Sequence, residues 1–159
     1  MRNLKTLALL TVFTLSGAAS AAGSATTAVT LTNTGADSIS VSTGTLASGG
    51  GNTISWATPA DGNFARKITA SVDVNGFSQG VNTLTLALSG KTGSGALTLP
   101  AGSFVFDKSV VGSLSQDIVN GIAAYSSGSA GATYTVGADG TGFTSSTITV
   151  TYTLTADGI

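Results

Sequence analysis

The sequence of 159 residues contains no cysteine and no histidine, and all seven of its acidic residues are aspartate. Without histidine a Ser-His-Asp triad cannot form, and without cysteine there are no thiol nucleophiles and no disulfides. The usual catalytic zinc sites need histidine or glutamate and are excluded as well. The aspartates lie mostly beside Gly, Asn or Ser in predicted turns. We therefore predict a protein that is not an enzyme and that holds no catalytic residues, metal or cofactor.

Charge is scarce too. Charged residues make up 8% of the chain, whereas about 25% is usual in soluble domains. Nucleic-acid binding relies on Lys and Arg that neutralise phosphates, and six basic residues are too few for that role or for a polybasic membrane patch. The hydrophobic fraction of 42% argues against disorder, which requires low hydrophobicity and high charge, and indicates a packed core.

The first 21 residues have the features of a secretory signal peptide. Arg2 and Lys5 form a basic start, residues 6–15 are apolar and uncharged, and Ala19-Ser20-Ala21 is a small-x-small cleavage pattern. This apolar stretch is too short to cross a bilayer of about 30 Å as a permanent helix. We expect residues 1–21 to be removed and residues 22–159 to form one β-sandwich domain; an uncleaved N-terminal anchor is the alternative.

Cleavage after Ala21 would leave four basic and seven acidic side chains. No later stretch is long and apolar enough to enter a membrane, so we expect no membrane insertion after cleavage. The predicted location is secreted, extracellular or on the cell surface, with the periplasm as the alternative.

Period-two alternation is the dominant pattern of the predicted domain. Residues 147–156, TITVTYTLTA, place Ile148, Val150, Tyr152 and Leu154 on one face and threonines on the other. We expect the apolar row, together with Trp56, to face the core and the threonines to face outward. Other alternating or apolar runs occur at 28–32, 38–42, 53–56, 68–74, 84–88, 97–99, 104–106 and 133–136.

Short strands separated by turn signals predict an all-β fold. The expected architecture is an antiparallel immunoglobulin-like sandwich of seven to nine strands, with a small barrel as the alternative. One stretch departs from the alternation, because Leu114, Ile118 and Ile122 have helical spacing. It predicts either a short helical turn near 114–122 that crosses between the sheets, or a strand followed by a corner.

The strand runs carry an unusual surface. Soluble β proteins usually protect open sheet edges with lysine, proline or an inward charge, but the runs at 28–32, 38–42, 84–88 and 147–156 contain no charge. An unguarded edge can pair with a neighbouring chain by strand addition. We therefore expect a structural or adhesive surface component, such as a fimbria-like filament, surface layer or matrix component, that pairs with itself or with other surface proteins. A monomer whose terminal strands pair internally is the alternative.

Four aromatic residues lie in or near predicted loops: Phe64, Phe77, Tyr125 and Phe143. Exposed rings on a β-sandwich can pack against the flat face of a sugar, so these residues are candidate ligand contacts. They predict a second functional class, an extracellular module that binds a ligand, most plausibly carbohydrate. Each ring could instead cover one end of the core.

Four segments together carry a resemblance: Ile54-Ser55-Trp56, and residues 66–70 (RKITA), 115–122 (SQDIVNGI) and 149–154 (TVTYTL). Their succession resembles uncharacterised exported bacterial proteins with immunoglobulin-like sandwich domains, over most of the predicted mature chain. The resemblance brings no functional residues. In outline the chain is also similar to bacterial fimbrial subunits, but it lacks their disulfide, and Tyr152 does not stand at their penultimate position. Chaperone–usher assembly is therefore not expected.

Overall fold

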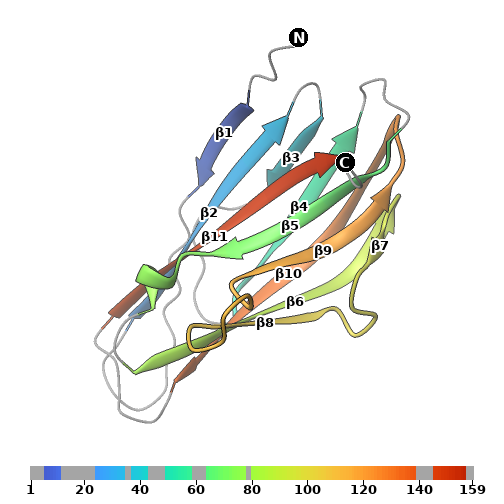
Figure 1. Ribbon diagram of the computed structural model, residues 1–159. Coiled ribbons are helices and arrows are strands. Elements are labelled where there is room, and N and C mark those ends of the chain that lie inside the picture. The colour runs from blue at the N-terminus through green and yellow to red at the C-terminus, as the bar shows by residue number, and fades with distance from the viewer. Residues whose placement is uncertain are drawn as a thin grey trace.

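The computed structural model describes residues 6–11, 24–34, 37–42, 49–58, 64–77, 80–138 and 145–156. These residues form two facing sheets (Figure 1). In spatial order, sheet A contains β1 (Thr6–Thr11), β2 (Ser24–Thr34), β11 (Ser145–Ala156), β5 (Arg66–Val72), β9 (Ser115–Ile122) and β7 (Ala96–Leu97). Sheet B contains β3 (Ser38–Val41), β4 (Gly51–Thr58), β10 (Ser126–Ala138), β6 (Val81–Gly93) and β8 (Ser103–Asp107). One 3₁₀ turn, η1 (Val74–Gly76), follows β5.

The predicted all-β sandwich is confirmed, and the two sheets are open rather than closed into a barrel. Two of the eleven described strands lie outside the predicted runs: β1 falls within the predicted signal peptide, and β9 falls in the stretch predicted as a helical turn or a strand. All described strand pairs are antiparallel except β2 and β11, which run parallel and pair Val29 with Val150 and Leu31 with Tyr152. No helix among the described residues is long and apolar enough to cross a membrane.

The core lies between the sheets and includes the predicted apolar row. Ile148, Val150, Tyr152 and Leu154 are fully buried, and Trp56 is 2% exposed. Burying one such side chain contributes about 1.5–3 kcal/mol. The threonines between them are exposed or half-buried, so the predicted orientation of this strand is confirmed.

A polar network crosses this core between the two sheets. The Tyr134 and Tyr152 hydroxyls lie 2.6 Å apart, and the Tyr134 hydroxyl also donates to Asn52 Oδ1 at 3.3 Å. Desolvation raises the pKa of both tyrosines above the ordinary value. The network therefore joins β4, β10 and β11 through groups that stay protonated and uncharged.

The segment near 114–122 is a strand, so the helical-turn prediction is wrong and its strand alternative is correct. Residues 115–122 form β9, whose register against β5 shifts around Ile68. Ile118 and Val119 are both buried although they are consecutive, as a β-bulge allows. The irregularity moves the next buried position to Ile122, which produces a four-residue spacing without a helix. The chain then turns from sheet A to sheet B.

The borders of the sheets are covered unequally. Beside β9, β7 pairs with Val119 and Asn120, and Thr98 continues the cover by donating its amide to the Ile118 carbonyl at 3.2 Å. At β8, the Gln116 side chain donates to the Val105 carbonyl at 2.7 Å. On the opposite side, β3 offers only four residues. The outer border of β2 pairs with β1 over Val29 to Thr34, whereas no described strand pairs there with residues 24–28.

Candidate functional site

At one end of the sandwich the chain crosses between the sheets four times, in the connections from β2 to β3, from β4 to β5, from β6 to β7 and from β9 to β10. They meet because β5 begins where β9 ends and β4 ends where β10 begins: Arg66 pairs with Ile122, and Thr58 pairs with Ser126. We call this region the crossover end. The described residues used to define it are Asp37, Thr58, Phe64, Ala65, Arg66, Ser94, Ala123, Ala124, Tyr125 and Ser126.

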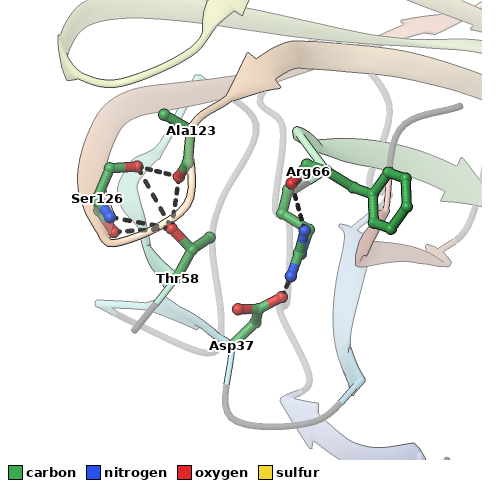
Figure 2. Close-up of polar contacts among 6 residues, drawn as sticks. Asp37, Thr58, Arg66, Ala123 and Ser126 are labelled. Atoms are coloured by element: carbon green, nitrogen blue, oxygen red, sulfur yellow. Dashed lines mark hydrogen bonds and ion pairs between the residues drawn. The ribbon is translucent and has the colours of Figure 1, made fainter. Parts of the chain in front are cut away.

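A buried ion pair joins the two sheets at this end (Figure 2). Arg66, the first residue of β5, donates from Nε to Asp37 Oδ2 at 2.6 Å and from Nη1 to the Phe64 carbonyl. Arg66 is 8% exposed and Asp37 2% exposed. The second carboxylate oxygen, Asp37 Oδ1, is buried without a hydrogen-bond partner. The pair therefore fixes both the entry to β3 and the backbone at Phe64.

A second polar cluster holds the connection from β9 to β10 (Figure 2). The fully buried Thr58 hydroxyl donates to the Ala123 carbonyl at 2.7 Å and accepts from the Ser126 amide at 3.1 Å. The Ser126 hydroxyl donates to the same carbonyl at 2.5 Å, and the Ala123 amide donates to Ser94 Oγ at 2.9 Å. Side chains from three other positions thus fix a connection that is three residues long.

Tyr125 occupies this connection with an unusual backbone. Its φ is +53°, and it is the only non-glycine residue with positive φ among the described residues. A residue other than glycine in this left-handed region costs roughly 1–2 kcal/mol. The Tyr125 residue is 73% exposed, so burial of its ring does not offset that cost.

The structure separates the four predicted aromatic contacts. Phe64 is 55% exposed and lies with Tyr125 at the crossover end. Phe64 comes shortly before β5 and Tyr125 shortly after β9, and these strands pair there through Arg66 and Ile122. Phe77 is buried in the core at the opposite end, after η1. Phe143 lies outside the described residues.

Sequence reasoning missed the ion pair and the Thr58 cluster. A signal for the ion pair was present, because Arg66 lies two residues before Ile68 and continues the alternation of Ile68, Ala70 and Val72. This alternation places Arg66 on the core face of β5. A charge on that face needs a buried partner, and aspartate was the only acidic residue type available. Nothing in the local sequence indicated the partners of Thr58, since Ser126 is 68 residues away.

The two charged side chains that follow Phe64, Arg66 and Lys67, are paired with aspartates. Lys67 Nζ lies 2.9 Å from Asp117 Oδ2, and hydrogen bonds from Thr69 and Lys67 lower the pKa of Asp117. No group of three acidic side chains that could hold a metal ion occurs among the described residues. The crossover end thus presents two exposed aromatic rings on an ordered backbone beside paired charges, which suits non-covalent contact with an uncharged partner.

Comparisons of the chain with family models, with curated proteins and with solved structures found no match.

Proposed function

We propose that the chain is an exported, non-enzymatic structural or adhesive protein of the cell surface whose copies associate by strand addition at β2. The observation that carries this proposal is the outer border of β2. Its eleven residues, SATTAVTLTNT, contain no charge and no proline, the two devices that most often protect an edge strand. At about 3.3 Å per residue such a border extends for roughly 36 Å.

The strand that covers β2 supports the proposal. β1 lies within the predicted signal peptide, so cleavage after Ala21 would remove it and leave the border open. β1 pairs with β2 antiparallel, from Thr6 opposite Thr34 to Thr11 opposite Val29. Once β1 is gone, an uncharged strand from another copy can pair with this border through backbone hydrogen bonds. This is the mode of recognition in strand addition.

The other borders favour association through β2 alone. Gln116 occupies the Val105 carbonyl of β8, and β7 with Thr98 covers β9. The four residues of β3 give a border too short for stable pairing by itself. A protein with one open border forms a defined contact, whereas several open borders would lead to irregular aggregation.

Sedimentation velocity and negative-stain microscopy of the product secreted when the whole chain is expressed test the proposal. We expect association that increases with concentration. Thr30→Lys places a charge within β2 and should shift the protein to monomer, because lysine on an edge strand opposes pairing. Thr135→Lys is the matched control, since it adds the same charge at an exposed position of the central strand β10 and should associate like the parent.

Circular dichroism of both variants checks that they fold. A parent protein that remains monomeric at high concentration and forms no ordered assemblies would contradict the proposal. Equal effects of the two lysine substitutions would show that charge in general, and not the β2 border, controls association.

A further inference from the structure

We propose that the crossover end is a binding site for a neutral carbohydrate chain, with Tyr125 and Phe64 as its two contact rings. This inference concerns a different surface from the β2 border and does not depend on association of the chain. It rests on the backbone conformation of Tyr125, on the polar contacts that fix the backbone beside both rings, and on the pairing of the charges that follow Phe64.

The backbone of Tyr125 shows that its ring is not there for packing. The turn from sheet A to sheet B requires a residue with positive φ, a conformation that glycine adopts without steric cost and asparagine adopts more readily than tyrosine. Tyrosine stands there instead, with 73% of its surface exposed. A residue kept in a strained conformation without burial is typical of a functional contact. With 73% of the residue exposed, its ring is open to contact with a ligand.

Both rings are attached to backbone that is already ordered. The Ala123 carbonyl accepts from Thr58 and Ser126 at 2.7 and 2.5 Å, and the Ala123 amide donates to Ser94. The Phe64 carbonyl accepts from Arg66, which Asp37 holds in turn. Such preorganisation lowers the entropy lost when a ligand binds, so weak stacking contacts can give measurable affinity.

The two charges that follow Phe64 in the sequence favour an uncharged ligand. Arg66 and Lys67 follow Phe64 directly in the sequence, and both are already paired with aspartates, at 2.6 and 2.9 Å. Neither cation is therefore available to bind a phosphate, sulfate or carboxylate group. A neutral ligand that contacts aromatic rings must present its own apolar face, and a pyranose ring does so through its axial C–H groups.

The small exposed apolar surface at the crossover end favours a sugar over a protein as the ligand. At the crossover end the exposed large apolar side chains among the described residues are Phe64 and Tyr125, and their neighbours are small or polar: Ala65, Ala123, Ala124 and Ser126. Protein partners usually need a contiguous apolar patch of several hundred Å². Two single rings, one before β5 and one after β9, instead suit contacts with individual pyranose units of an unbranched chain.

Titration calorimetry of the secreted product tests the site with cellohexaose, N-acetylglucosamine hexamer and mannohexaose as neutral probes, and with an oligogalacturonate as the acidic probe. We expect at least one neutral hexasaccharide to bind and the acidic probe not to bind. Tyr125→Gly should lower the affinity about tenfold or more, as loss of an anchoring ring does, and Phe64→Ala should act similarly. Tyr125→Phe keeps the ring and should retain binding.

The stability of the same variants provides a second readout. Tyr125→Gly relieves the left-handed strain, so it should raise the Tm while it weakens binding. A residue with a merely structural role would change stability and affinity in the same direction, or neither. Val111→Ala, at a fully exposed position in the loop between β8 and β9, is the control for loss of exposed apolar surface and should bind like the parent. Repeating the titration on Thr30→Lys separates this site from association at β2.

Failure of all three neutral probes to bind would overturn the inference, as would binding of the acidic probe alone. Unchanged affinity in Tyr125→Gly would also overturn it. None of these results bears on the sedimentation behaviour of the parent protein, which tests the proposed function independently.

Discussion

Asp37 is a buried carboxylate in a chain that has few charges. The free-energy cost of removing it from water must be offset by a nearby opposite charge. Its Oδ2 lies 2.6 Å from Arg66 Nε, whereas Oδ1 has no partner. Removing one member of such a pair leaves the other charge buried and uncompensated, which is more costly than removing both.

Asp37→Ala is therefore expected to lower the free energy of unfolding by about 3–5 kcal/mol, measured by urea denaturation. The control is the double substitution Asp37→Leu with Arg66→Met, which replaces the pair by apolar side chains and should recover most of that loss. A single variant as stable as the parent would show that the ion pair does not fix the crossover end.

The buried tyrosine pair makes stability depend on alkaline pH. Burial raises the pKa of Tyr134 and of Tyr152 in the folded state, whereas in the unfolded chain both titrate near their ordinary value of about 10. Above that pH the folded protein retains protons that the unfolded chain has lost, so the free energy of unfolding falls as the pH rises.

The measurement is urea denaturation of the parent protein and of Tyr134→Phe at several pH values from neutral to about 11. The parent should lose stability above about pH 10, and the variant should lose it less steeply because it has one titrating group fewer. A stability that stays constant throughout this range would contradict the burial of the pair.

At the scale of single elements, β10 shows how one central strand fits the core. Gly128 lies against the Trp56 ring, and a Cβ atom at this position would stand 2.5 Å from Cζ2. Gly131 is three residues further along the same strand, where a Cβ atom would meet its nearest neighbour, Ser89 Oγ, at 3.4 Å.

Gly128→Ala should therefore destabilise the protein by about 1–3 kcal/mol, since the Trp56 ring must shift in a packed core. Gly131→Ala is the matched control and should have little effect or stabilise slightly, because alanine reduces the freedom of the unfolded chain. Thermal denaturation of the two variants measures the difference. Equal Tm values would contradict the packing of Trp56 against β10.

The elements also show which features could be predicted from the sequence. β11 was predictable because apolar and polar residues alternate strictly from Ile148 to Leu154. This alternation is by itself sufficient to indicate a strand with one buried face. β9 was ambiguous, since its bulge places Ile118 and Val119 both inside and disturbs the alternation. Register shifts arise from pairing with a distant strand, so a local pattern does not reveal them.

The candidate site was predictable only in part. Phe64 and Tyr125 could be assigned to loops from their neighbours, but that the loops meet follows from the antiparallel pairing of β5 with β9. Phe77 had an equally favourable local sequence, yet it is buried in the core. Which end of a sandwich a loop occupies is a property of the topology, and a short sequence segment carries no information on it.

At the scale of the whole molecule, polar threonine-rich faces and scarce charge leave few means of protecting a sheet border. The protein uses a glutamine at β8 and a short strand at β9, whereas β2 has neither. Its outer border is covered by β1, which lies in the predicted signal peptide. Export would therefore couple removal of the leader to exposure of the border that we propose for association.

Amide hydrogen exchange of residues 24–34 in the secreted product, compared at low and high protein concentration, tests this account most directly. We expect exchange in β2 to slow as the concentration rises, because the amides on its outer border become hydrogen-bonded to another copy, while exchange in β8 and β9 stays unchanged. Exchange in β2 that is the same at both concentrations would contradict association by strand addition.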